Sequence, residues 1–114
     1  MANLGEIEAA LAVLEQAGTS RSRITVLHCT TEYPAPPEEV NLRAMNTIAQ
    51  SFGVAVGYSD HTLPKDMSTL EIATILGSLI LEKHFTFDKS LPGNDHYHSF
   101  DGKDLKQYKD KLKE

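Results

Sequence analysis

Three short runs of β-branched and apolar residues alternate with amphipathic helix patterns along this chain of 114 residues. The runs cover residues 24–30 (ITVLHCT), 54–59 (VAVGYS) and 79–85 (LILEKHF), and each is too short for a stable helix. Their starts lie 30 and then 25 residues apart, which is the length of a β-α-β unit. The order α, β, α, β, α, β, α therefore predicts an α/β fold with parallel strands joined by right-handed crossovers.

Polar residues stand where the intervening helices should begin. The predicted caps are Asn3 with Glu6, Asn41, and Ser68 with Glu71. Glycines close the same three helices at Gly18, Gly53 and Gly77. A polar terminal helix with a weak apolar stripe is predicted over residues 103–114.

A parallel sheet of three strands leaves one face and both edges open, although parallel sheets are normally covered on both faces. Three strands in 114 residues are what a segment of a (β/α)8 barrel would contain, since a complete barrel needs roughly 250 residues. A short flavodoxin-like sheet has the same alternation and is the alternative. No linker divides residues 1–114, which we expect to form a single segment.

Composition excludes several classes of function. The formal net charge of -5 argues against a nucleic-acid or anionic-membrane surface, and Cys29 is the lone cysteine, so an internal disulfide framework is excluded. No apolar stretch is long enough to span a membrane, and the chain start lacks a signal-peptide pattern. These features predict a cytoplasmic protein that acts on small molecules or binds a protein partner.

Two histidines follow neighbouring strands of the predicted sheet. Alternation places Ser59 and His61 on one face of the second strand, and Glu82 and His84 on one face of the third. Because the carboxyl ends of parallel strands meet at one edge, the two imidazoles are expected to converge there. Neutral imidazoles bind ions such as Mn, Fe, Co, Ni and Zn. The pair is therefore a candidate metal site, with ordinary hydrogen-bonded histidines as the alternative.

The remaining histidines are interpreted as structural or solvated. His28, beside Cys29, is predicted to be a hydrogen-bonded histidine of the core. His96 and His98 lie in a loop, and we expect them to be solvated rather than to bind a metal.

Of three further side chains, Asp60 and Tyr33 each have two interpretations. Asp60 either orients the neighbouring His61 or caps the loop. Asp95 follows a Pro-Gly-Asn turn and is read first as a turn residue. Tyr33 is either a loop anchor or the wall of a binding pocket.

The strings HCTTEYPAP, NLRAM, GYSDHT, LEKHFT and LPGNDH together resemble the sialic acid synthase family. Members condense phosphoenolpyruvate with N-acetylmannosamine or a related N-acylamino sugar to give a nonulosonic acid and phosphate. The resemblance implies a (β/α)8 barrel followed by an antifreeze-like domain. On this basis the chain is expected to be barrel strands six to eight with their flanking helices, with the earlier strands and the antifreeze-like domain absent.

The resemblance also implies roles for individual residues. His61 and His84 match the histidines that hold a divalent metal, Mn or Mg, and serve in catalysis. Ser59 matches the serine that binds the phosphate of phosphoenolpyruvate. Tyr33 and Asp95 match residues that contact the amino sugar.

A departure from the family pattern concerns the sugar. Thr31 stands where sialic acid synthases often have a ligand-binding asparagine, so we expect a substrate contact here that differs from theirs. The loop between His61 and Ser68 is about two residues longer than in those enzymes. Together with the DHYH string, this longer loop favours a relative that makes a diamino sugar acid such as legionaminic acid, or a spore-coat-type relative.

In the mechanism that the resemblance implies, the metal polarises the sugar aldehyde while carbon 3 of phosphoenolpyruvate attacks it. The phosphate-binding lysines, an acidic residue near the reacting carbons and an arginine from the antifreeze-like domain would lie outside these residues. We therefore expect the isolated chain to be inactive. The alternatives are a non-catalytic module that binds metal or sugar and a split-enzyme subunit that needs a complementary barrel chain. The complete parent is expected to be a homodimer.

Overall fold

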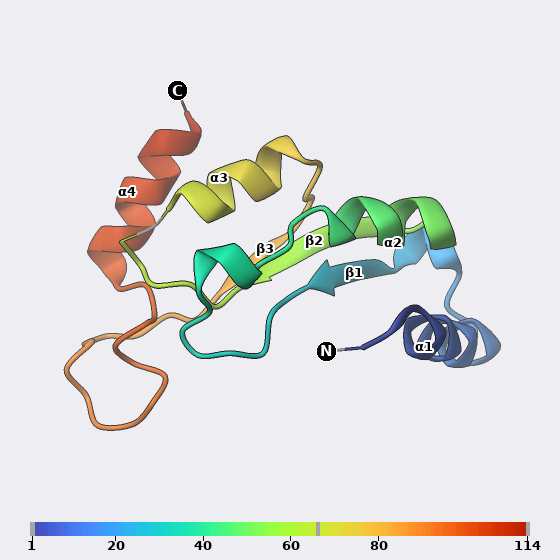
Figure 1. The fold of residues 1–114 in the computed structure, drawn as a ribbon, viewed down its shortest axis with the longest axis horizontal. Helices are drawn as coiled ribbons and strands as arrows, with labels where there is room; N and C mark the ends of the chain where they lie inside the picture. Colours follow the sequence, from blue (N-terminus) through green and yellow to red (C-terminus); the bar gives the residue numbers. More distant parts are fainter. Residues whose placement is uncertain (1, 66, 114) are drawn as a thin grey trace.

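A computed structural model describes residues 2–65 and 67–113 of the chain. The described elements are α1 (Leu4–Gln16), β1 (Thr25–His28), α2 (Ala44–Phe52), β2 (Ala55–Asp60), α3 (Ser68–Ile75), β3 (Leu81–Lys83) and α4 (Gly102–Leu112). Short 3₁₀ turns lie at Arg21–Arg23 and Pro37–Glu39. The predicted alternation of helices and strands is confirmed (Figure 1).

Within the described residues the strands form one parallel sheet in the order β1-β2-β3, as predicted. Leu27 is paired with Gly57 in the first ladder. A Cβ atom at Gly57 would lie 2.4 Å from the main-chain oxygen of Ile80, so this position accepts only glycine without a backbone shift. The close approach sets the spacing between β2 and the start of β3.

Helices α2 and α3 lie on one side of the sheet (Figure 1). Val56 and Tyr58 point from β2 into the core on this side, where they join the buried Met45 of α2 and Leu70 of α3. Apolar burial of this kind is the main source of stability in a small domain.

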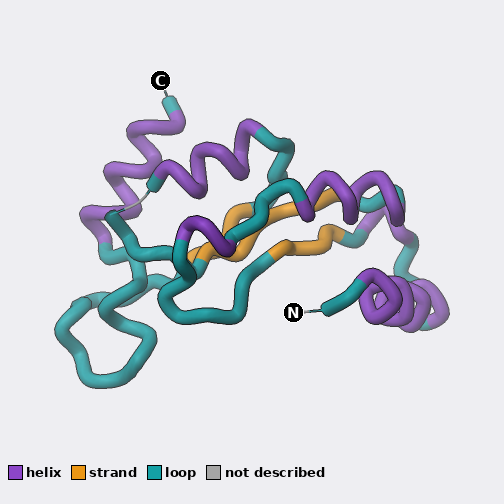
Figure 2. Tube along the Cα trace, viewed as in Figure 1, coloured by secondary structure: helices purple, strands orange, loops and turns teal. Residues whose placement is uncertain are grey.

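The opposite side of the sheet is more open. Leu27 and Ile80 share the face of Gly57 and are 36% and 48% exposed. Figure 2 shows that the loops after β1 and β3 lie at the same end of the sheet, where the strands have their carboxyl ends. Among the described residues, no helix has the length and apolar character needed to cross a membrane.

The helix starts only partly follow the prediction. The capping box of α1 is confirmed, because the Glu6 N–H donates to the Asn3 side chain at 2.8 Å and the Asn3 N–H donates to Glu6 at 3.0 Å. Asn41 does not cap α2; it adopts a left-handed conformation with φ of 48°, and Arg43 occupies the capping position. The loop after the prolines therefore turns sharply before the helix starts.

Two other boundaries differ as well. Ser68 is the first residue of α3 rather than its cap, and Met67 stands before it without a side-chain hydrogen bond to the helix. Helix α4 begins one residue earlier than predicted, because Asp101 forms a capping box with Asp104. Glu114, at the end of the predicted terminal helix, lies outside the described residues.

Candidate metal and substrate site

His61 directly follows β2 and is buried. Its Nδ1 atom lies 2.7 Å from the main-chain oxygen of Thr30, at the end of the neighbouring strand β1. Since a carbonyl oxygen only accepts, Nδ1 carries the proton and Nε2 keeps its lone pair. This arrangement fixes the ring and is the usual way in which proteins orient a metal-binding histidine.

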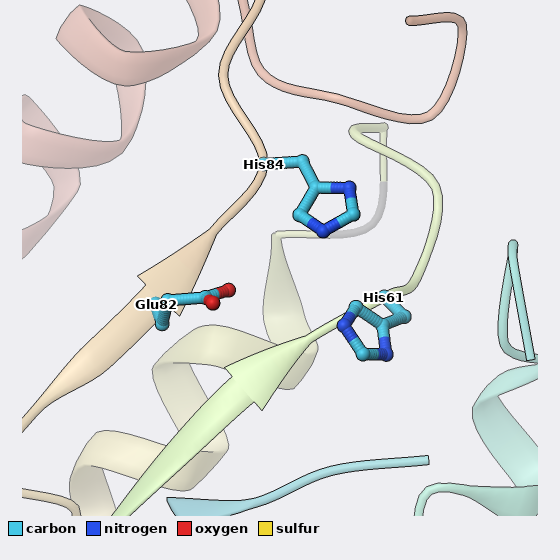
Figure 3. A group of neighbouring side chains, drawn as sticks. All are labelled: His61, Glu82 and His84. Atoms are coloured by element: carbon cyan, nitrogen blue, oxygen red, sulfur yellow. The ribbon is translucent and has the colours of Figure 1, made fainter. Parts of the chain in front are cut away.

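His84 follows β3 and faces His61 across the strand ends, with ring centroids 5.4 Å apart. The possible ligand atoms of His61, Glu82 and His84 all lie within 4.8 Å of one another (Figure 3). Among the described residues, the buried Nδ1 atom of His84 has no hydrogen-bond partner. A buried polar atom without a partner costs about 1–3 kcal/mol, and a cation bound to it would remove that cost. Imidazole nitrogens and carboxylate oxygens are ligands for divalent cations, so this group has the chemistry to hold one.

Ser59 lies one position before the salt-bridged Asp60, on the same strand face as His61. Its hydroxyl group donates to Oε1 of Glu82 at 3.0 Å, and the two residues are paired in the β2–β3 register. The sheet itself therefore brings a hydroxyl donor, a carboxylate and two imidazoles to one edge.

Tyr33 lies over this edge in the loop after β1. Its ring centroid is 4.3 Å from that of His61 and 5.8 Å from those of His84 and His98. The Ala35 N–H donates to the main-chain oxygen of His61 at 2.8 Å and holds the loop in place. These contacts favour a pocket wall over a simple loop anchor, and the Tyr33 side chain keeps 45% exposure to solvent.

The loop after β3 adds a third histidine to the group. His98 is 1% exposed, and its ring centroid lies 5.5 Å from that of His84. The expectation that it is solvated is therefore wrong, because the loop folds back over the strand end. Burial lowers the pKa of His98, and the neighbouring His84 lowers it further. These effects favour the neutral imidazole.

The other residues of this loop lie closer to solvent. Asp95 is largely exposed, and its Oδ1 atom is 3.5 Å from Nε2 of His98. His96 is half-buried, and its Nδ1 atom is 2.7 Å from the hydroxyl group of Thr86. Asp95 thus lies beside His98 at the site, whereas His96 is engaged by the hydroxyl group of Thr86.

Asp60 does not orient His61, which settles one alternative. Its carboxylate accepts from Tyr58, Thr62 and Lys83 on the opposite face of the strand. Thr30 rather than Asp60 is the partner of the His61 ring.

The positions of two other residues singled out in the sequence, His28 and Thr31, are as follows. Nε2 of His28 is 2.6 Å from the main-chain oxygen of Val40, which confirms a structural histidine. Thr31 is exposed at the start of the loop that carries Tyr33.

Sequence reasoning did not nominate two members of the group as site residues. Glu82 could have been found, because it shares the strand face of His84 two positions earlier. His98 had no comparable signal, since its place depends on how a long loop folds.

Parallel α/β folds, both barrels and open sheets, carry their functional sites at the carboxyl ends of the strands, and this segment places imidazole and carboxylate groups there. The NeuB family model matches residues 1–114, and the chain belongs to that family. The resemblance drawn from the sequence motifs is thereby confirmed.

Relatives and solved structures agree with this assignment. The N,N'-diacetyllegionaminic acid synthase of Campylobacter jejuni is 54% identical over 106 residues, which are 93% of this chain and 31% of that protein. The crystal structure of the spore coat polysaccharide biosynthesis protein SpsE from Bacillus subtilis has a TM-score of 0.86 at 34% identity, covering 98% of this chain and 31% of that one.

A sialic acid synthetase from Leptospira borgpetersenii has a TM-score of 0.85 at 31% identity, covering 99% of this chain and 38% of that one. The chain therefore spans about a third of the length of these proteins.

Proposed function

We propose that this chain is part of a synthase that condenses phosphoenolpyruvate with an N-acylated mannosamine-type sugar to give a nonulosonic acid and phosphate. The observation that carries the proposal is the convergence of His61, Glu82 and His84 at the carboxyl ends of parallel strands in a NeuB family chain. Synthases of nonulosonic acids are among the relatives it matches.

We assign β1, β2 and β3 to strands six, seven and eight of a (β/α)8 barrel. The open face with Leu27 and Ile80 supports this assignment, because a barrel buries that face against its other strands. Residues 1–114 would then be one segment from the C-terminal portion of the barrel domain. The remaining length of the relatives has room for five more strands and an antifreeze-like domain.

His61 and His84 would hold a divalent cation, with Glu82 close enough to join them. Two imidazoles and a carboxylate suit Mn better than Mg, which prefers oxygen ligands. A cation held by these residues would supply Lewis-acid chemistry, which would polarise the aldehyde oxygen of the sugar and make its carbon easier to attack. The Thr30 carbonyl holds His61 in the tautomer that this role requires.

The protein side chains would bind and orient the two substrates. Ser59 would donate its hydroxyl hydrogen bond to the phosphate of phosphoenolpyruvate, in place of the Glu82 carboxylate that accepts it here. Tyr33 offers a flat apolar wall for the sugar, and Asp95 offers an exposed acceptor for its hydroxyl or amide groups. Thr31, exposed two residues before Tyr33 in the same loop, would be a further sugar contact.

The proposed reaction is the one that the family resemblance implies. Carbon 3 of phosphoenolpyruvate would form a bond to the aldehyde carbon as the aldehyde oxygen takes a proton. Water would then add at carbon 2 and lose a proton, and phosphate would leave as its bond to carbon 2 breaks and the ketone forms. Groups that neutralise the phosphate would come from the rest of the barrel, so the 114 residues alone should not turn over. The complete enzyme would act as a homodimer.

The acceptor sugar is proposed to carry two acylated amino groups. The Campylobacter jejuni relative, at 54% identity, is named as a synthase of N,N'-diacetyllegionaminic acid, which supports this choice.

The test measures phosphate release from phosphoenolpyruvate by the whole protein, with N-acetylmannosamine and with a diacylated diamino sugar as acceptors. After bound metal is removed with a chelator, we expect turnover only when Mn²⁺ is added back. Turnover should be faster with the diamino sugar. His61→Ala should lower kcat at least about 100-fold, since even outer partners of metal ligands cost 10–100-fold. The matched control is His28→Ala, which removes a structural histidine. Absence of turnover with both sugars, or full activity of His61→Ala, would overturn the proposal.

A further inference from the structure

His98 differs from the other histidines outside the proposed pair in how its ring is satisfied. His28 and His96 each place a ring nitrogen within 2.7 Å of a protein oxygen. Nε2 of His98 is buried and has no hydrogen-bond partner among residues 2–65 and 67–113. If His98 served only for packing, this buried nitrogen would remain without a hydrogen-bond partner, at a cost of about 1–3 kcal/mol.

The surroundings of this nitrogen point to a cation rather than to a protein partner. The possible ligand atoms of His84, Asp95 and His98 all lie within 4.8 Å of one another. The Asp95 oxygen stands 3.5 Å from Nε2 of His98, which is too long for a good hydrogen bond but compatible with both atoms contacting one ion. Neighbouring rings of Tyr33 and Tyr97 fix the orientation of the His98 ring.

The two groups that share His84 differ in how free their members are. In the first group Glu82 already accepts a hydrogen bond from Ser59, whereas the Thr30 bond at Nδ1 of His61 leaves the Nε2 atom of that ring free for an ion. In the second group both imidazoles have a buried ring nitrogen without a partner in the described part of the chain. A cation entering without substrate therefore finds beside His84 a carboxylate that is not engaged by Ser59, Asp95, and a buried imidazole nitrogen without a partner, on His98.

We propose that His98 is a cation ligand and that, without substrate, the divalent ion of the proposed synthase lies between His84, Asp95 and His98. This inference rests on the proposed function. A neutral imidazole offers one nitrogen lone pair to a metal. A single ion bound to His84 is therefore completed either by His61 and Glu82 or by Asp95 and His98. Sugar binding to Asp95 would release that carboxylate from the ion and favour the position next to His61.

The test compares Mn²⁺ affinity of the substrate-free whole protein by electron paramagnetic resonance. His98→Phe keeps a ring in the buried space, and His98→Gln keeps a polar end; both should bind Mn²⁺ at least about tenfold more weakly. His96→Phe, two residues away in the same loop, is the matched control and should leave the affinity unchanged. Unchanged affinity in both His98 variants would overturn the inference.

Crystals soaked with Mn²⁺ give an independent readout. We expect an anomalous peak at coordination distance from His84, Asp95 and His98 in the substrate-free protein. A peak only between His61, Glu82 and His84 would overturn this inference and leave the proposed function standing. Mn²⁺ affinity that is insensitive to both His61→Ala and His84→Ala would overturn both.

Discussion

Lys83 and Asp60 form a buried ion pair between β3 and β2, with Nζ 3.0 Å from Oδ2. The same strand register that pairs these residues also pairs Ser59 with Glu82 one position earlier. Because side chains alternate, the ion pair lies on the opposite face of the sheet from the site. It joins the two strands whose ends carry the candidate metal ligands.

Loss of one partner of this pair should cost much stability. Burial lowers the pKa of Lys83, and the Asp60 charge opposes that shift, so the charged form of Lys83 depends on Asp60. Lys83→Met in the whole protein should lower the free energy of unfolding by about 3–5 kcal/mol in urea titrations, because a buried carboxylate is left unpaired. Lys106→Met, which removes an exposed pair with Asp110, should change it by less than about 0.5 kcal/mol. Equal effects of the two variants would contradict the prediction.

Gly57 should not accept a side chain. Gly57→Ala places a Cβ atom 2.4 Å from the Ile80 oxygen, and we expect a loss of about 1–3 kcal/mol from the resulting strain. Gly5→Ala, in the first turn of α1, meets only ordinary contacts and should raise stability by up to about 1 kcal/mol. Thermal unfolding followed by circular dichroism measures both. A neutral Gly57→Ala would show that β2 and β3 can move apart freely.

The cap of α4 should depend on pH. The Asp104 N–H donates to the Asp101 carboxylate at 3.0 Å and holds the pKa of Asp101 below its ordinary value of 3.8. A lowered pKa in the folded state means that the stabilisation is complete above about pH 3.8 and is lost as the pH falls through the folded value. The melting temperature of wild type relative to Asp101→Asn should therefore fall in acid. A difference that is constant from pH 5 to pH 2 would contradict this expectation.

Substitution of Ser59 should weaken the binding of phosphoenolpyruvate more than the binding of the sugar. Ser59→Ala removes the hydroxyl proposed to bind phosphate, and a hydrogen bond to a charged group contributes about 1.5–3 kcal/mol. We expect the KM for phosphoenolpyruvate to rise about tenfold or more, with little change in the KM for the sugar. Steady-state phosphate release with each substrate varied in turn measures the two values. Equal increases in both would remove Ser59 from the phosphate site.

Local patterns in the sequence determined the order of the elements and the face of each strand. The runs around Val56 and Leu81 are strands because β-branched and apolar residues fill a half-buried surface, and alternation then fixes which side chains share a face. The convergence of His61 and His84 followed from that rule alone. The capping box at Asn3 was equally local, because its two hydrogen bonds span three residues.

Only the tertiary structure decided which groups partner the two histidines. Thr30 holds His61 from just beyond the end of β1, 31 residues away along the chain, and His98 reaches His84 through a loop of irregular shape. Neither contact has a periodic signature, since a loop's path depends on packing against the finished sheet rather than on its own residues. Asp60 illustrates the same limit. Beside His61 in sequence, it points to the other face, where Lys83 offers the opposite charge that a buried carboxylate requires.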